Sequence, residues 1–420
     1  MSRLQDYKDA VTGITSGYAF NDGVDPMVPY SFNGTIFDQD ERELLLAVLQ
    51  QDALTMGPQV AVFQNEFAAW CGVKHAFAVS NCTTAMHVVT QALGIGEGDE
   101  VIVTPNTFIA TSLVVLKEGG VPVYADIDPR TYNIDPGEIE SKITPRTKAI
   151  YVVHYAGQMC DMDPIMEIAR RHGLPVMEDC AHAHGATYKG RRAGSIGDFG
   201  CWSFHSLKNM ALGEGGMITT NRSDLVDAIE KLRCMNTTHW DNKPTTDYWL
   251  PSHFDVKDVN GKWGDNYRMT EFQAAIGRAQ LRKVDMLIEK RRAASHYLTA
   301  GLKDVEGYIT PYEDPNCFHA YHLYTLCTEP SVLDRDEVMR DIYYRQRCTQ
   351  GILHYQPTYD FTGVKKYLEA RGRGGQFCKH ADEFFYRREF NLPMHPRLTQ
   401  RELDIMIEGL CEAAKRCRRK

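Results

Sequence analysis

Residues 178–221 read EDCAHAHGATYKGRRAGSIGDFGCWSFHSLKNMALGEGGMITTN, and this stretch decides the fold of the chain. An acidic pair, Glu178 and Asp179, ends one apolar run, and Lys208 follows a second run at residues 200–204. A glycine-rich turn at residues 213–216 then leads into a third run. Short apolar runs bounded by glycine and polar residues predict buried strands. Charged side chains are therefore expected at the ends of neighbouring strands.

Outward from this stretch, apolar runs alternate with helical patterns. Strands are predicted at residues 76–80, 100–104, 121–126, 149–154, 174–178 and 200–204. Helices are predicted between them, at residues 83–93, 164–172 and 222–233. This alternation predicts an α/β fold in which helices cover both faces of a mostly parallel sheet. Ligands of such sheets bind at the carboxyl ends of the strands.

The last third of the chain follows another pattern. A long helix at residues 269–302 leads to a strand at 319–327, a helix at 335–344 and a final helix at 399–415. The final helix opens with a capping box formed by Thr399 and Glu402. We expect an N-terminal arm at residues 1–35, a large domain at 36–290 and a small α+β domain at 291–420.

Composition excludes several classes of protein. The formal charge of the 420-residue chain is −8, whereas a nucleic-acid binder needs a surplus of Lys and Arg. The basic residues 415–420 are interpreted as a solvated helix end. No apolar run reaches the length of a membrane helix, and twelve cysteines occur without a Cys-x-x-Cys pair. These features predict a soluble cytoplasmic protein with reduced thiols and no metal, nucleic-acid or membrane partner.

The order of Asp179 and Lys208 is typical of pyridoxal phosphate (PLP) enzymes. A lysine that holds the cofactor as a Schiff base must lose its proton far below its usual pKa of about 10.4. A carboxylate must lie against the pyridine nitrogen, so that the ring remains protonated. Taken singly, a loop lysine such as Lys208 is usually a solvated charge, and Asp179 alone would also be explained as a helix cap. His182 and His184 resemble a metal pair, but no further ligands follow at zinc spacing.

One motif has a misleading appearance. Residues 94–98, GIGEG, look like a dinucleotide-binding turn, but they follow a predicted helix and precede a strand. A dinucleotide site requires the reverse order, so we interpret these residues as a helix-ending turn.

The chain resembles the DegT/DnrJ/EryC1/StrS family of PLP-dependent sugar and aminocyclitol aminotransferases. The resemblance runs from about residue 28 to 410 and rests on the 178–221 block together with LTMGP (54–58), GVKH (72–75), GDEV (98–101), NYRM (266–269), HY (354–355) and LPMHP (392–396). It implies PLP-dependent transferase fold type I: an α/β fold with a mostly parallel, seven-stranded sheet flanked by helices, and a smaller α+β C-terminal domain.

The resemblance also implies roles for individual residues. Lys208 would bind the cofactor and carry protons, Asp179 would pair with the pyridine nitrogen, and His182 would lie near the ring hydroxyl. The aromatic ring of Phe108 would stack on the cofactor. The phosphate would be bound by Cys82, at a position where the family usually has Gly, and by Thr83, Ser203 and the partner's Asn266. Candidate substrate contacts are Thr55, Met56, His205, Arg268 and His354.

The function implied is transfer of an amino group from L-glutamate or L-glutamine to a keto group on a nucleotide-linked or free sugar or on a cyclitol, in antibiotic or surface-polysaccharide biosynthesis. Lys208 favours an aminotransferase, because family members that dehydrate sugars carry His there. A PLP-dependent sugar dehydratase or lyase and a non-catalytic regulatory protein of the same fold remain alternatives. A homodimer with shared active sites is expected.

Two irregular segments have open interpretations. Residues 237–265 are rich in aromatic side chains, and either the acceptor pocket or the subunit interface would account for them. The loop with Arg371 and Arg373 would either meet a pyrophosphate or be solvated.

Overall fold

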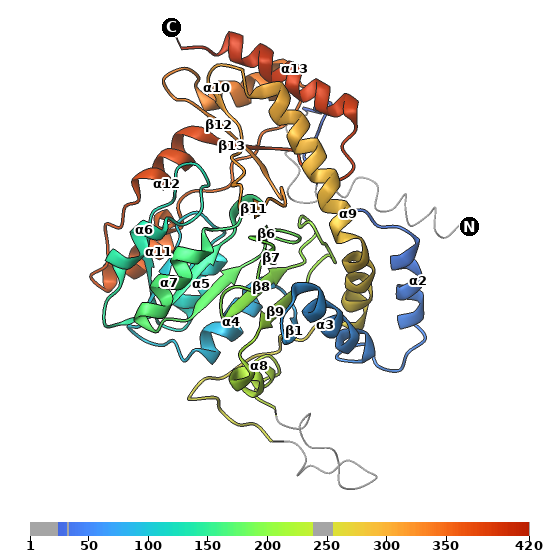
Figure 1. Ribbon diagram of the computed structural model, residues 1–420, viewed down its shortest axis with the longest axis vertical. Coiled ribbons are helices and arrows are strands. Elements are labelled where there is room, and N and C mark those ends of the chain that lie inside the picture. Colours follow the sequence, from blue (N-terminus) through green and yellow to red (C-terminus); the bar gives the residue numbers. More distant parts are fainter. Residues whose placement is uncertain (1–23, 32, 238–254, 420) are drawn as a thin grey trace.

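The computed structural model describes residues 24–31, 33–237 and 255–419, and its centre is a seven-stranded sheet (Figure 1). The order of the strands is β1-β9-β8-β5-β4-β2-β3. Their bounds are β1 His75–Val79, β2 Glu100–Val103, β3 Val121–Tyr124, β4 Thr147–Val153, β5 Val176–Asp179, β8 Phe199–Ser203 and β9 Gly216–Thr220.

The sheet is mostly parallel, as the alternating sequence pattern predicts. Strands β3, β2, β4, β5 and β8 run parallel to one another, whereas β9 is antiparallel to both β8 and β1. Every strand predicted from an apolar run in this region is present, with ends displaced by about two residues or fewer. The α/β fold class is confirmed.

Helices cover both faces of the sheet because successive strand residues point to opposite sides. Phe77, Val79 and Val103 pack into one buried cluster with helices α4 and α5, whereas Ala76 and Ile102 pack into another with α3 and α7. The helix bounds are α2 Gln39–Val48, α3 Pro58–Cys71, α4 Cys82–Ala92, α5 Ala110–Lys117, α6 Pro136–Ile139, α7 Met162–His172 and α8 Val226–Leu232. Residues 223–225 of the predicted helix 222–233 form a 3-10 turn instead.

A long helix leads from this layer to a second, smaller sheet (Figure 1). Helix α9, Glu271–Leu302, spans 32 residues, so the expected domain boundary at 290/291 falls within it. The small antiparallel sheet has the order β10-β12-β13. Its elements and the remaining ones are β10 Tyr308–Ile309, β12 Tyr324–Thr328, β13 Glu389–Leu392, α10 Arg335–Arg340, α11 Thr362–Ala370, α12 Lys379–Glu383 and α13 Gln400–Arg416, with short strands β6 Thr187–Tyr188, β7 Arg191–Arg192 and β11 Cys317–Phe318.

Two predicted elements of this part differ from the structure. The strand expected at 319–327 begins only at Tyr324, because the N–H groups of Ala320 and His322 donate to the backbone of Gly157 and Ala156. The helix expected at 335–344 is α-helical only to Arg340 and continues as a π turn. In the first of these places, contacts with a distant segment override the local pattern.

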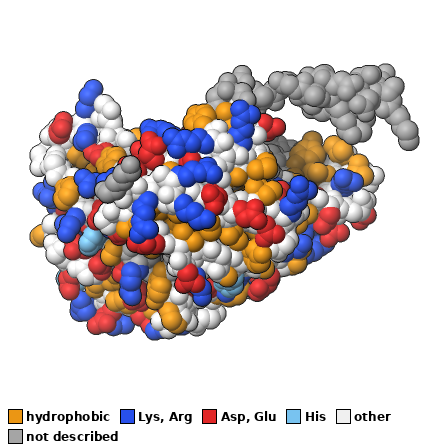
Figure 2. Space-filling view, turned by 90° about the horizontal axis from the view of Figure 1, so that it is seen from above, with side chains coloured by type: hydrophobic (Ala, Val, Ile, Leu, Met, Phe, Trp, Pro, Cys, Tyr) orange, Lys and Arg blue, Asp and Glu red, His pale blue; other side chains and the backbone are white. Residues whose placement is uncertain are grey.

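The final helix agrees with its sequence signature. Thr399 and Glu402 form the predicted capping box. Basic residues at its last position and beyond are paired: Arg416 with Asp341, Arg418 with Glu306 and Arg419 with Asp334. On the face shown in Figure 2, Lys and Arg side chains are interspersed with Asp and Glu. Among the described residues, none of the helices has the length and apolar character that a membrane span needs.

Glu271 ties the start of α9 to the start of α3. Its buried carboxylate accepts the backbone N–H groups of Gly57 at 2.9 Å, Gln59 at 2.8 Å and Val60 at 3.0 Å. The N-cap residue Gly57 has no side chain to accept these bonds, so Glu271 acts as the cap of α3 from a distant part of the chain.

Replacing Glu271 by Ala should lower the free energy of unfolding by about 2–4 kcal/mol, because three helix-end donors lose their acceptor. Glu271→Gln retains one acceptor oxygen and should lose less. The exposed Glu43→Ala on α2 is the control and should change stability by less than about 0.5 kcal/mol. Urea unfolding at one protein concentration measures all three, and equal losses for Ala and control would contradict the capping role.

Candidate active site

Asp179 is the last residue of β5, and its carboxylate is fixed by two hydrogen bonds. Oδ2 accepts the Thr111 hydroxyl at 2.8 Å, and Oδ1 accepts the N–H of Ala181 at 3.0 Å. The side chain is buried, and burial raises the pKa of the carboxyl. Thr111 belongs to α5, which follows β2, so the carboxylate at the end of β5 is held from a second strand–helix unit on the far side of β4.

Lys208 lies in the loop after β8, on the same edge. Desolvation lowers the pKa of its amine to about 8, against the opposing influence of the nearby Asp179 carboxylate. Among the residues that the structure describes, none forms a hydrogen bond or ion pair with the Lys208 ammonium. An amine with a lowered pKa and no fixed partner has the properties of a nucleophile.

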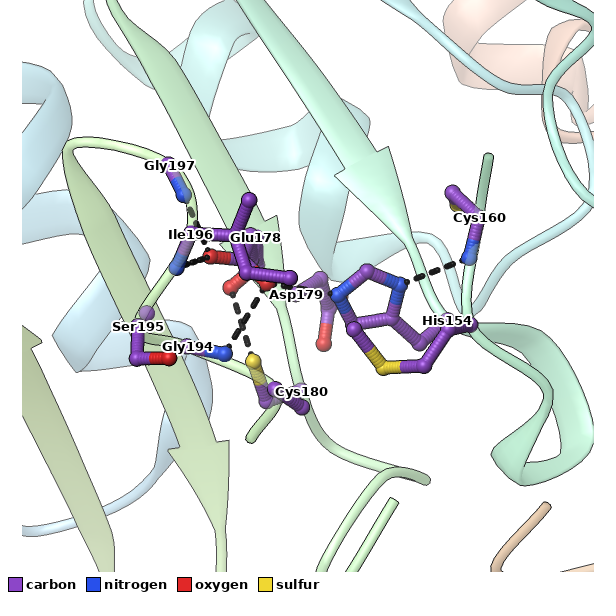
Figure 3. Close-up of polar contacts among 12 residues, drawn as sticks. His154, Cys160, Glu178, Asp179, Cys180, Gly194, Ser195, Ile196 and Gly197 are labelled. Carbon is purple, nitrogen blue, oxygen red and sulfur yellow. Dashed lines mark hydrogen bonds and ion pairs between the residues drawn. The ribbon is translucent and has the colours of Figure 1, made fainter. Parts of the chain in front are cut away.

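The neighbouring Glu178 has a different role, which Figure 3 shows. Its carboxylate accepts the N–H groups of Gly194 at 2.9 Å, Ile196 at 2.8 Å and Gly197 at 2.6 Å, and it accepts His154 Nε2–H at 2.8 Å. Because His154 Nδ1 accepts the N–H of Cys160, its proton is on Nε2. Burial would raise the pKa of Glu178, but these donors together lower it.

Glu178, His154 and Cys180 lie close enough together to suggest a metal site. However, the hydrogen bonds just described already use both oxygens of Glu178 and both ring nitrogens of His154. The group is therefore explained as a structural network that fixes the loop leading into β8.

His182 lies within a cluster of neutral imidazoles. Its Nδ1 accepts the N–H of Ala156 at 3.3 Å, and its ring packs on His322 with a centroid distance of 4.2 Å. His322 is hydrogen-bonded in turn to Asn209. Burial lowers the pKa of both histidines well below the usual value, so both rings are uncharged at neutral pH.

The first turn of α4 presents backbone donors near Asp179. Asn81 caps the helix by accepting the N–H of Thr84, whereas the N–H groups of Cys82 and Thr83 have no acceptor among the described residues. The Cys82 Sγ lies 4.0 Å from Asp179 Oδ1. β9 lies so close to this turn that a Cβ atom on Gly216 would be 2.4 Å from the backbone oxygen of Asn81, which explains the glycine at this position. Such a helix end attracts anions.

Exposed aromatic rings lie at the edge of this region. Phe108 is 50% exposed and Tyr355 is 53% exposed, and their ring centroids are 5.6 Å apart. The ring of His354 lies 5.7 Å from that of His182. Flat apolar faces of this kind are suited to packing against a ring-shaped ligand.

The predicted residues therefore divide into two sets. The first lies around Lys208 and comprises Asp179, Cys82, His182 and His354. Phe108 is linked to this set through the ring of Tyr355, which contacts that of His354. Ser203 ends β8, and its hydroxyl accepts the N–H of His205 at 3.4 Å. The His205 ring lies 3.9 Å from the Glu214 carboxylate.

The second set lies near the start of α9. The Thr55 hydroxyl donates to Met269 O, Met56 has a positive φ of 50°, and the exposed Asn266 accepts Arg268 Nε–H at 2.9 Å. No contact among the described residues joins this set to Lys208 or Asp179.

Two open interpretations can be compared with the structure. Arg371 pairs with Glu97, and Arg373 pairs with Glu100, the first residue of β2, at the opposite edge of the parallel strands from Asp179. These ion pairs argue against a role in binding a pyrophosphate at the site. Most of segment 237–265, at residues 238–254, lies outside the described residues, and of its tryptophans only Trp263 has a known exposure, 63%.

Sequence reasoning missed several residues of the site. Thr111 could have been predicted from the sequence. It follows Phe108 by three positions, and residues at that spacing lie on the same face of a helix. Tyr155, whose ring lies 5.1 Å from His354 and 6.0 Å from His182, and His322 gave no local signal. Both reach the site through contacts between distant segments.

The comparisons with known proteins agree with this geometry. Residues 35–411 match the model of the DegT/DnrJ/EryC1/StrS aminotransferase family. The chain is 40% identical to GDP-perosamine synthase of Caulobacter vibrioides, covering 89% of this chain and 95% of that protein. It is 36% identical to the spore coat polysaccharide biosynthesis protein SpsC of Bacillus subtilis, covering 92% and 97%. An aminotransferase structure from Psychrobacter cryohalolentis superposes with a TM-score of 0.82 at 33% identity, covering 93% and 100%.

Proposed function

The chain belongs to the DegT/DnrJ/EryC1/StrS aminotransferase family, and from this premise we propose that it transfers an amino group from L-glutamate or L-glutamine to a keto group on a nucleotide-linked sugar. It is a PLP-dependent aminotransferase of fold type I. The observation that carries the reaction is that a desolvated Lys208 amine, unpaired among the described residues, lies close enough to the oriented Asp179 carboxylate to be influenced by its charge. The acceptor is inferred from the similarity to GDP-perosamine synthase.

The residues present fit the cofactor. Its phosphate would meet the free N–H groups of Cys82 and Thr83, with the hydroxyls of Thr83 and Ser203 beside them. The Cys82 side chain does not close this helix end, because its Sγ lies towards Asp179. Asp179 would pair with the ring nitrogen, and Phe108 would cover the ring face.

When bound, PLP supplies an aldehyde that takes up the amino group and a ring that accepts electrons. The chain supplies the proton transfers. Lys208 Nζ, with a pKa near 8, can release or accept a proton at neutral pH. Asp179, held by Thr111, would favour a proton on the ring nitrogen. The neutral His182 would offer a hydrogen bond to the ring hydroxyl without adding charge.

The alternatives are less well supported. A sugar dehydratase of this family would carry His in place of Lys208. A non-catalytic regulator has no physical reason to retain the desolvated lysine together with the oriented carboxylate. Twelve free thiols suit a reducing, cytoplasmic compartment, which we include in the proposal.

Amino transfer should be detected when the purified protein receives L-glutamate or L-glutamine and a panel of nucleotide-linked keto-sugars. Mass spectrometry would identify the aminated sugar. A panel of keto-cyclitols runs in parallel, and reaction with these alone would overturn the proposed acceptor. A dehydrated product without nitrogen would favour the lyase.

Borohydride should fix the cofactor to Lys208, which peptide mass analysis would locate. Lys208→Ala should retain its fold and bind PLP without a covalent bond. Its turnover should fall at least about a hundred- to ten-thousand-fold, because the group that moves the proton is lost. The matched control is Lys189→Ala, an exposed lysine paired with Asp163, which should keep normal turnover. A label on another lysine would refute this assignment.

We also propose a homodimer in which Asn266 binds the phosphate of the partner's cofactor. Asn266 is exposed, and among the described residues its side chain is hydrogen-bonded only to Arg268. Exposed apolar side chains are concentrated on the nearby N-terminal segment: Phe37, Leu46, Leu49, Leu54 and Val62. Such a concentration is typical of a protein interface.

Asn266→Ala should weaken PLP retention by about 1–3 kcal/mol, the value of one charge-assisted hydrogen bond. Equilibrium dialysis against PLP measures the loss, and sedimentation analysis should find a dimer in both proteins. Asn316→Ala, at another exposed asparagine, should retain PLP normally. A fully active monomer would rule out shared sites.

A further inference from the structure

Glu389 is a buried carboxyl group in the small sheet that the mechanism above does not use. It begins β13 and has no exposed surface. Oε1 accepts the backbone N–H of His354 at 2.7 Å, and Oε2 accepts Asn391 Nδ2–H at 3.1 Å. Among the described residues no cationic side chain forms an ion pair with it, although Arg335 is near enough to act on it electrostatically.

The absence of a cation in contact determines the charge of Glu389. Burial raises the pKa of its carboxyl to about 8, so the group is mostly a neutral acid at pH 7. A neutral acid can remain in a dry sheet without the cost of burying an unpaired ion. It can still accept hydrogen bonds from the segment beside it.

That segment is the turn at His354 and Tyr355. Backbone pairing with β13 ends two residues earlier, where Ile352 and Asn391 exchange hydrogen bonds of 3.0 and 2.8 Å. The bond to Glu389 therefore extends the attachment beyond the last backbone pair. Asn391 is held in turn by the Thr325 hydroxyl at 2.7 Å, so the anchor is itself fixed to β12.

The turn faces the active site. The His354 ring lies 5.1 Å from Tyr155 and 5.7 Å from His182, and its Nε2 is buried without a hydrogen-bond partner among the described residues. Tyr355 lies beside Phe108 at the exposed edge. A shift of the turn would move both rings relative to Lys208 and Asp179.

We propose that Glu389 is a positioning residue that, by accepting the His354 N–H from inside the small sheet, fixes the His354–Tyr355 turn in the orientation that receives the substrate. The inference rests on the proposed function only where it states that substrate meets this turn. A purely structural Glu389 would instead affect stability and leave substrate affinity unchanged.

Two substitutions separate these roles. Glu389→Gln keeps an acceptor for the His354 N–H and cannot ionise. Glu389→Leu keeps the apolar bulk and removes the acceptor. The control is Thr328→Val, which removes an equally buried polar group one residue beyond Cys327, the β12 partner of Glu389, and whose hydroxyl donates to the backbone of Arg387 and not to the turn.

The first readout needs no substrate. Hydrogen exchange of the peptide that contains residues 352–355 should be about tenfold faster or more in Glu389→Leu, because the amide loses a buried acceptor. Glu389→Gln and Thr328→Val should exchange as the wild type does. Unchanged exchange in Glu389→Leu would overturn the proposal.

The second readout is the single half-reaction of the PLP-loaded enzyme with L-glutamate, followed by absorbance. Glu389→Leu should raise the half-saturating concentration of L-glutamate about tenfold while the limiting rate stays within about threefold, because Lys208 and Asp179 are untouched. Glu389→Gln should restore the half-saturating concentration. An equal loss of limiting rate in Glu389→Leu and Thr328→Val, with the half-saturating concentration unchanged, would overturn the proposal. If the wild type fails with every amino donor, the proposed function falls, and the exchange experiment still decides the role of Glu389.

The pH dependence of stability gives an independent measurement. The folded chain keeps the Glu389 proton up to about pH 8, whereas the unfolded chain loses it near pH 4.3. Stability should therefore fall with rising pH across this interval, and the fall should be smaller in Glu389→Gln. An equal fall would contradict a neutral acid. The titratable or charged groups that act on or sense this carboxyl are Tyr30, Tyr155, Cys327 and Arg335.

Discussion

The alternation of side chains along β5 is the constraint on which the site depends. Glu178 and Asp179 are adjacent, so a strand sends them to opposite faces of the sheet. The Glu178 carboxylate accepts hydrogen bonds from three backbone N–H groups and from His154, and these bonds fix the loop that leads into β8. Asp179 is left for the other face, where Thr111 orients it. Because β8 leads to Lys208, the structural carboxylate determines where the lysine lies relative to the functional one.

Burial without a matching counter-charge is the second common feature. Desolvation brings the pKa of the Lys208 amine and that of the Glu389 carboxyl to about 8. It lowers the pKa of Arg291 to about 9, although this guanidinium donates to four backbone carbonyls, those of Gly34, Tyr321, His322 and Met394. Lys208 and Glu389 would be fully ionised in water at pH 7 and here titrate near neutral pH, whereas Arg291 keeps its charge. At Lys208 this allows proton transfer, whereas at Glu389 it allows a dry hydrogen-bonded anchor.

The sequence predicted those features that have a local cause. Apolar runs located the strands of the large sheet, and the order of Asp179 and Lys208 indicated the chemistry. The contact of His322 with His182 joins residues 140 positions apart, and no periodicity encodes it. The role of Glu389 could not be predicted from the sequence either, because it depends on a hydrogen bond from the His354 N–H, 35 residues earlier in the chain. The prediction of a strand at residues 319–323 was wrong, because backbone N–H groups of this segment donate to the carbonyls of Ala156 and Gly157 instead of to a neighbouring strand.

The two sheets contribute to different parts of the site. The large sheet supplies Asp179 and the loop of Lys208, and hydrogen bonds within its own strand–helix units orient Asp179 and fix the loop before β8. The small sheet contributes to the edge of the site through the turn anchored by Glu389, and Arg291 on α9 binds the backbone carbonyl of Met394, two residues after β13. Substitutions on the small sheet can therefore move His354 and Tyr355 without disturbing proton transfer at Lys208. On this reasoning, the choice of substrate can change along a family while the chemistry stays constant.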